Sequence, residues 1–208
     1  MHVVSVRVGS AREIQIGSRT EMSGIIKEPV QRAVVMADGV EGDAIVSTEH
    51  HGGLDQALYL YGADDYAWWG MPEGLFGENL TLSTLGSDDP RVGDRYVIGE
   101  VVLEVTAPRI PCAKVGVRAG DAEFPKRFTA ARRPGPYARV ISGGEIEPGT
   151  EVELRRAPDD ALTILEIQDL YHDRSPAIAD LERALAAPVA RRVREGMERK
   201  LARARTSP

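Results

Sequence analysis

The stretch RYVIGEVVLEVTAPRIPCAK, residues 95–114, gives the clearest indication of the fold. Its first part has two short apolar runs on either side of Gly99 and Glu100, and glycine can supply the positive φ angle of a tight turn. This pattern predicts a β-hairpin. Pro108 and Pro111 make the segment that follows poorly suited to a regular strand, because proline has no backbone N–H to donate.

Short apolar runs of this kind recur up to about residue 156, and glycine and proline separate them. Apolar residues at alternate positions are typical of strands with one buried face. So many short strands in succession predict a mainly β fold of the α+β class, built on a β-barrel or a curled antiparallel sheet. Besides the hairpin, we expect strands at residues 2–8, 13–16, 31–36, 57–61, 137–141 and near 152–154, and a short helix at 64–69.

The last fifty residues have a helical period instead. Thr163 and Glu166 fit a capping box, Ser175-Pro176 fits the start of a second helix, and apolar residues recur every fourth position after Pro188. We therefore expect a β-barrel domain at residues 1–157 and a three-helix extension at 158–208. The last helix is rich in arginine and lysine, and the simplest interpretation is a solvated face.

The composition is that of an ordinary globular chain, with 208 residues, 42% of them hydrophobic and 28% charged. The N-terminus does not resemble a signal peptide, and no apolar run approaches the roughly 18 residues that span a bilayer. The single cysteine cannot form an internal disulfide. A cytoplasmic protein without a membrane partner is therefore expected.

Positive charge is concentrated in one segment of an acidic protein. The formal net charge is −6, yet residues 109–139 contain eight lysines and arginines against two acidic residues, which leaves −12 on the rest of the chain. Such a basic island can attract a small anion, and the acidic surroundings argue against non-specific nucleic-acid binding. A solvated loop would show the same charges, so the pattern alone does not decide between the two.

Cys112 is the first candidate for chemistry. A lone intracellular cysteine is more often a small buried apolar residue than a reactive one. Here, however, it follows two prolines and lies between Arg109 and Lys114, whose charges favour the thiolate over the thiol. A thiolate is both the nucleophilic form of sulfur and a soft ligand for a transition metal.

Three other segments could bind a ligand. His51 stands directly before the glycine pair Gly52-Gly53, which lets the backbone approach a ligand, although a polar loop has the same composition. Asn79 offers amide groups that can read the edge of a heterocycle, but Glu-Asn after glycine is also a common turn. Arg139 is expected to share a strand face with Tyr137 and could bind phosphate, or it could be an exposed strand arginine.

Taken together and in order, these motifs resemble those of a MOSC domain (molybdenum cofactor sulfurase C-terminal-like), in the stand-alone bacterial, YiiM-like branch. The resemblance covers roughly residues 3–154. The matching segments are GVEGD at 39–43, HGGLDQAL at 51–58, FGENL at 76–80, GD at 93–94, PRIPC at 108–112 and YARV at 137–140.

The resemblance implies a MOSC-type β-barrel that binds the molybdopterin form of the molybdenum cofactor. It makes Cys112 the expected molybdenum ligand or sulfur acceptor. Better-studied family members reduce N-hydroxylated compounds, and others act with a pyridoxal-phosphate cysteine desulfurase. By the same resemblance, Arg109, Lys114 and Arg139 would neutralise the pterin phosphate, and His51, Gly52 and Asn79 would orient the pterin.

This chain departs from the family pattern in three ways. It contains no fused desulfurase region, it has no cysteine cluster for an iron–sulfur centre, and Pro136 stands where an aromatic residue is common. Any electrons must therefore come from a separate protein, or any sulfur from a separate cysteine desulfurase. The three hypotheses are a molybdenum-dependent oxidoreductase acting on a small molecule, a sulfur carrier, and a binding protein without turnover. The sequence does not fix the oligomeric state.

The change of period predicts that the β domain folds without the extension. Truncation after Ala157 should leave a β-rich far-ultraviolet circular dichroism spectrum and a cooperative thermal transition. Solubility should fall, because apolar surface under the helices becomes exposed. A truncated chain without a cooperative transition would contradict the domain division.

Overall fold

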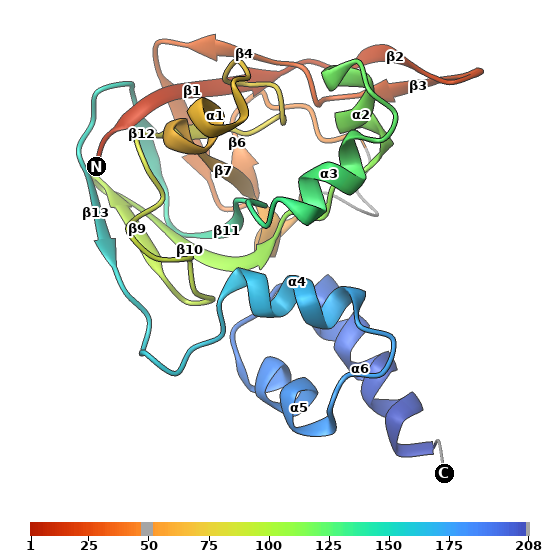
Figure 1. Ribbon diagram of the computed structural model, residues 1–208. Coiled ribbons are helices and arrows are strands. Elements are labelled where there is room, and N and C mark those ends of the chain that lie inside the picture. The colour runs from red at the N-terminus through yellow and green to blue at the C-terminus, as the bar shows by residue number, and fades with distance from the viewer. Residues whose placement is uncertain (47–51, 207–208) are drawn as a thin grey trace.

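The computed structural model describes residues 1–46 and 52–206 (Figure 1). The expected hairpin of residues 95–105 is present, and Asp64–Trp69 is helical as predicted. The strands are β1 Val3–Gly9, β2 Arg12–Ile16, β3 Arg19–Ser23, β4 Lys27–Val30, β5 Ala33–Met36, β6 Gly39–Val40, β7 Leu58–Gly62, β8 Leu80–Leu82, β9 Arg95–Ile98, β10 Val101–Pro108, β11 Pro136–Ser142, β12 Gly144–Ile146 and β13 Val152–Arg155. The helices are η1 Leu54–Gln56, α1 Ala63–Trp69, α2 Ala113–Ala119, α3 Phe124–Ala130, α4 Ile164–His172, α5 Ile178–Ala186 and α6 Arg191–Thr206.

The main sheet has eight strands in the order β13-β9-β10-β11-β7-β8-β1-β4, and it curls on itself. Only the β7–β8 pairing within it is parallel. The start of β1 returns to the segment before β13, where Val3 N donates to Thr150 O at 2.9 Å and Val152 N to Met1 O at 2.9 Å. The mainly β class is thus confirmed, and a few isolated hydrogen bonds, not a continuous ladder, close the barrel-like sheet.

Two apolar clusters fix the core of the β domain. One fills the interior of the curled sheet with side chains such as Leu60, Leu103 and Ile98. The other is aromatic and joins the outer face of the sheet to α1, α2 and α3; its members include Phe76 and Phe128, whose ring centroids lie 5.0 Å apart. The aromatic cluster holds the two helices that directly follow Cys112.

The three C-terminal helices form a separate group beside β10 (Figure 1). The predicted capping box is present, because Glu166 N donates to Thr163 Oγ1 at 3.1 Å and Thr163 N to Glu166 Oε2 at 2.8 Å. The expected start of the second helix at Ser175-Pro176 is wrong, since α5 begins at Ile178. Ser175 N instead donates to Asp173 Oδ1 at 2.8 Å in a turn. None of the helices in the described ranges is long and apolar enough to cross a bilayer.

The basic last helix is not a uniformly solvated face, which corrects the simplest sequence interpretation. Arg194 donates to Leu185 O at 2.7 Å and to Ala187 O at 3.0 Å. Arg192 donates to Gly52 O at 3.2 Å in the β domain. These arginines thus fasten the extension to itself and to the barrel.

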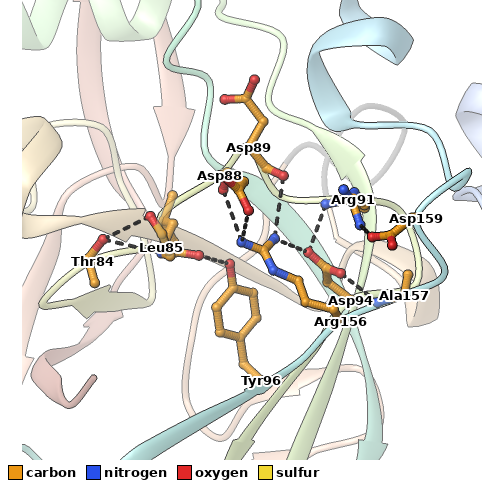
Figure 2. Close-up of polar contacts among 11 residues, drawn as sticks. Thr84, Leu85, Asp88, Asp89, Arg91, Asp94, Tyr96, Arg156, Ala157 and Asp159 are labelled. Atoms are coloured by element: carbon orange, nitrogen blue, oxygen red, sulfur yellow. Dashed lines mark hydrogen bonds and ion pairs between the residues drawn. The ribbon is translucent and has the colours of Figure 1, made fainter.

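Asp94, from the Gly93-Asp94 motif, holds the end of the β domain that leads to the extension (Figure 2). Its fully buried carboxylate accepts from Arg91 N at 2.9 Å, from Ala157 N at 2.8 Å and from Arg156 Nη1 at 2.9 Å. Three donors converge on one charge, so the carboxylate fixes the path of the chain between β13 and α4. Buried charges in proteins are tolerated when they are hydrogen-bonded in this way.

Replacing this carboxylate by an amide should therefore destabilise the protein. Asp94→Asn places an NH₂ group against donors, and we expect the free energy of unfolding to fall by about 3 kcal/mol. Arg156→Gln, which removes a partly exposed partner, should cost about 1 kcal/mol. Urea denaturation of both variants measures the difference. Equal small losses would show that the carboxylate is not required.

Candidate functional site

A pocket lies between the curled sheet and the loops beside it, and we call it the inner pocket. Its volume is about 80 Å³. Strands, helix ends and the loops between them form its wall: Ser23, Gly24, Ile25, Lys27, Asp43, Ala44, Ile45, Val46, Gly52, Gln56, Ala57, Tyr59, Gly77, Asn79, Arg109, Cys112, Lys114 and Tyr137. Segments that lie far apart in the sequence thus meet around one cavity.

Most of the residues proposed from the sequence meet in this pocket. Gly52, Asn79, Arg109, Cys112 and Lys114 all line it. His51 lies outside the described residues.

Arg139 is not brought to the pocket. Its guanidinium donates to Pro188 O at 2.7 Å and lies 3.3 Å from Asp55 Oδ1. The register of β10 shifts between Val105, which lies opposite Ala138, and Ala107, which lies opposite Tyr137, while Arg139 lies opposite Glu104. Tyr137 lines the pocket, whereas Arg139 joins β11 to the segment before α6.

Cys112 lies at the boundary between the inner pocket and a second cavity. It is the N-cap residue of α2, it is partly exposed, and its extended backbone follows Pro111. The second cavity, which we call the outer groove, has a volume of about 590 Å³ and runs between the barrel and the C-terminal helices. Cys112, Lys114, Gln56 and Tyr137 line both cavities. Cys112 therefore belongs to the wall of both cavities.

Arg109 is a buried cation in the inner pocket. Its residue is only 4% exposed, its Cζ lies 4.6 Å from the centroid of the Tyr59 ring, and its Nη1 donates to Tyr137 Oη at 3.3 Å. Burial acts to lower the pKa of Arg109, but Tyr137, Tyr59 and Cys112 oppose that effect and leave the pKa above its ordinary value. The guanidinium is therefore charged at any physiological pH.

The charge of Arg109 has no counter-ion in the part of the chain that the structure describes. None of the ion pairs among residues 1–46 and 52–206 includes it, and its buried Nε has no hydrogen-bond partner there. Burying a charge without a partner costs several kcal/mol. The inner pocket is thus suited to an anion that would supply the missing charge and acceptor.

A second buried cation, Lys27, was not expected from the sequence, and it is fully paired. Its Nζ lies 2.5 Å from both carboxylate oxygens of Asp43, which also accept from Gly9 N at 2.7 Å and from Asn79 Nδ2 at 2.9 Å. Burial lowers the pKa of Lys27, and Asp43 opposes that shift. Asp43 was within the GVEGD segment, whereas nothing in the sequence around Lys27 distinguishes it.

Asn79 and Lys114 are held by contacts with the protein itself. The Asn79 amide oxygen accepts from Tyr59 N at 3.3 Å while its nitrogen donates to Asp43, so both ends of the amide have protein partners. Lys114 Nζ lies 3.6 Å from Glu21 Oε2 and donates to Met22 O at 3.4 Å. Asn79 thus shapes the pocket wall, and Lys114 holds the β2–β3 hairpin beside Cys112.

The wall at residues 52–56 depends on a close approach and on the extension. Gly52 has φ +70°, and a Cβ there would lie 2.6 Å from the Ile45 side chain, so glycine allows the two loops to meet. Arg192 of α6 donates to Gln56 Oε1 at 2.5 Å and to Gly52 O. A residue more than one hundred positions away in the sequence therefore braces the pocket, and sequence reasoning missed it.

Residues 47–153 match the family model of the MOSC domain. The chain belongs to the MOSC domain family. This match includes every segment of the pocket except residues 23–46. MOSC domains are associated with molybdenum-cofactor binding in general.

Individual relatives place the MOSC domain of this chain in the YiiM-like branch. The crystal structure of YiiM from Geobacillus stearothermophilus is similar with a TM-score of 0.76 at 30% identity, over 96% of this chain and 98% of that one. The protein YiiM of Escherichia coli is 28% identical over 152 residues, 68% of each chain. A protein of Gibberella moniliformis named "Reductase" is 30% identical over 198 residues, which are 90% of this chain but 35% of that protein.

The isolated charge of Arg109 predicts an unusual pair of effects in this MOSC domain. Arg109→Met keeps most of the side-chain volume and removes the buried charge, so the melting temperature in anion-poor buffer should stay unchanged or rise. Inorganic phosphate should raise the melting temperature of the parent protein, because it binds the folded state, and should have a smaller effect on the variant.

Arg155→Met, at an exposed arginine that pairs with Glu153, is the matched control and should keep the full response to phosphate. A large loss of stability in Arg109→Met, with an unchanged phosphate response, would show that Arg109 is a structural residue and not an anion ligand.

Proposed function

We propose that this MOSC protein binds the molybdopterin form of the molybdenum cofactor in the inner pocket and reduces N-hydroxylated bases or related N–O compounds. The observation that carries the proposal is that Cys112 and the buried cation Arg109 line the same cavity. A thiolate suits a soft metal, and an isolated buried guanidinium suits a phosphate. The "Reductase" name of the fungal relative supports the same direction.

The donor set of the pocket fits a cofactor that brings most of its own metal ligands. Across residues 1–46 and 52–206, no three histidine, cysteine or acidic side chains are placed to hold a metal ion. Cys112 would be the protein ligand of molybdenum, and Arg109 would hold the phosphate of the pterin. Lys114, Gly52, Asn79 and, by resemblance, His51 would form the wall against which the pterin lies.

When bound, the cofactor supplies the two-electron redox chemistry, and the chain supplies position and electrostatics. Pro108 and Pro111 restrict the backbone before Cys112, and the helix α2 begins directly after Cys112. Lys27 and Asp43 neutralise each other, so the net charge felt by a ligand comes from Arg109 and Lys114. The Lys114 charge is partly offset by Glu21, which leaves Arg109 as the principal anion ligand.

In this proposal a separate protein supplies the electrons, and the substrate enters through a cavity of this chain. The single cysteine of the chain cannot ligate an iron–sulfur cluster, so a separate electron-donor protein is required. A small-molecule substrate would reach Cys112 through the outer groove, which is the larger cavity on its exposed side. A reducing compartment such as the cytoplasm keeps the thiol available.

The partial exposure of Cys112 also supports a second function, sulfur transfer. The Cys112 thiolate would attack the outer sulfur of a persulfide on a partner cysteine desulfurase, and the partner would leave as a thiolate. The bond between the two partner sulfurs breaks as the new sulfur–sulfur bond forms on Cys112. This function needs no bound metal.

Cys112→Ser separates these functions, because serine is nearly isosteric but does not ionise near neutral pH and cannot carry a persulfide. We expect the variant to melt within a few degrees of the parent, yet to lose bound molybdenum and all reduction of an N-hydroxylated base. Elemental analysis, thermal melting and an activity assay on protein from a cofactor-competent host measure the three quantities.

Three other results would point elsewhere. Full molybdenum and activity in Cys112→Ser would refute Cys112 as the ligand. A parent that lacks molybdenum but carries one extra sulfur by intact mass, absent in the variant, would establish the carrier. Loss of folding in Cys112→Ser would show that Cys112 serves the packing of the fold and not the chemistry.

A further inference from the structure

Gln56 holds a buried amide at the boundary between the inner pocket and the outer groove. The residue is only 9% exposed, and it lines both cavities, as Cys112 and Tyr137 do. Its Oε1 accepts from Arg192 Nη1 at 2.5 Å, whereas nothing in the described ranges accepts a hydrogen bond from its Nε2. A buried amide donor without an acceptor costs free energy, so this NH₂ group is suited to a ligand.

The Nε2 atom of Gln56 opens into the space where the two cavities meet. Arg109 Nε is sealed from solvent, but Gln56 Nε2 keeps some accessible surface. The rest of Gln56 is packed against protein, and the residue belongs to both cavity walls. The amide therefore presents its N–H donors at the same boundary to which Cys112 belongs.

Arg192 decides which end of this amide faces the cavities. A guanidinium has donors and no acceptor, so the Gln56 atom that contacts it must be the oxygen, and the NH₂ group must point away. Arg192 also donates to Gly52 O at 3.2 Å, and one residue earlier Arg191 N donates to Asp55 Oδ2 at 3.1 Å. Contacts from α6 thus hold the segment that carries the amide, and the extension sets its direction.

We propose that Gln56 Nε2 donates a hydrogen bond to the oxygen of an N–O group bound beside Cys112, and that Arg192 is the positioning residue for this donor. The inference rests on the proposed function. There a hydroxylamine takes up two electrons, supplied by the separate donor protein through the cofactor, and two protons, and it becomes an amine and water.

Gln56 transfers no proton in this step. The N–O bond breaks with its electron pair on the oxygen, and the amide N–H groups stabilise the negative charge that develops there. The product amine lacks this oxygen, so the same contact favours the oxidised substrate over the reduced product.

The other polar groups that the two cavities share are already engaged. Tyr137 Oη accepts from Arg109 Nη1 at 3.3 Å, and Lys114 Nζ lies 3.6 Å from Glu21 Oε2. The thiol is the metal ligand in the proposed function. Gln56 is therefore the neutral donor that remains at the boundary for an uncharged oxygen.

The chain without cofactor tests the donor directly. Quinoline N-oxide carries an acceptor oxygen that quinoline lacks, and both probes are neutral at pH 7.5. Isothermal titration calorimetry gives their affinities, and iodoacetamide, which alkylates Cys112 alone, reports by intact mass whether a probe lies beside the thiol. We expect the N-oxide to bind about tenfold more tightly than quinoline, as one hydrogen bond allows, and to protect Cys112 at lower concentration.

Substitutions separate the donor from the residue that orients it. Gln56→Met keeps the side-chain length and removes the amide, so both probes should bind with the affinity that quinoline has in the parent. Arg192→Met keeps the amide but lets it rotate, so most of the preference should disappear while quinoline binding stays unchanged. The matched control is Arg191→Met, because Arg191 is the exposed neighbour in α6 that pairs with Glu195 at 3.3 Å, and it should keep the full preference.

The molybdenum-loaded protein gives a second measurement. Gln56→Met should keep its molybdenum and lower kcat for an N-hydroxylated base at least about tenfold, while KM changes less. The reason is that the charge on the oxygen is larger in the transition state than in the bound substrate.

Four results would overturn the proposal. Equal binding of both probes by the parent, or an unchanged preference in Gln56→Met, would refute the donor. An unchanged preference in Arg192→Met, or an equal loss in Arg191→Met, would refute the positioning role.

The same calorimetry in Cys112→Ser keeps this inference separate from the proposed function. Preference for the N-oxide in Cys112→Ser and in a parent that never binds molybdenum would leave the Gln56 donor standing and refute the cofactor assignment. An active, molybdenum-loaded parent without the preference would do the reverse.

Discussion

The buried carboxylate of Asp43 is the group on which the shape of the inner pocket depends. It accepts hydrogen bonds from Gly9 at the end of β1, from Lys27 at the start of β4 and from Asn79 beside β8. Three strand ends are therefore fixed around one charge, which is compatible with burial only because every partner is present. The pair with Lys27 also cancels that charge, which leaves Arg109 and the partly offset Lys114 as the cations of the pocket.

Local sequence patterns predicted the elements that local interactions determine. The hairpin around Gly99, the capping box at Thr163 and the proximity of Arg109 to Cys112 all depend on residues a few positions apart. The helices α2 and α3 were not predicted, because seven residues form a stable helix only through tertiary packing. Here that packing is supplied by Val115, Phe124 and Phe128 in the aromatic cluster, and the rings they contact come from distant segments.

The directions of two side chains at the site depend instead on contacts with residues far away in the sequence. The sequence placed Arg139 and Tyr137 together at the site, but Arg139 contacts Asp55 and Pro188, which come from distant segments, while Tyr137 lines the pocket. Arg192 could not be assigned to the pocket from the sequence, since its partner Gln56 is 136 positions away. Both cases depend on long-range geometry that no local pattern records. The extension is thus part of the site's architecture even if the barrel folds without it.

The location of Cys112 explains why one thiol can support either of two chemistries. On its inner side, a fixed cation and a narrow cavity select a ligand by charge. On its outer side, a groove of about 590 Å³ with apolar residues in its walls selects a ligand by shape. A sulfur carrier needs the outer side to admit a loop of a partner protein, whereas a reductase needs it to hold a small molecule. Lys114 draws the β2–β3 hairpin toward the thiol, and Arg192 draws α6 toward the same point. This narrows the approach from both sides, and a bounded groove favours the small molecule.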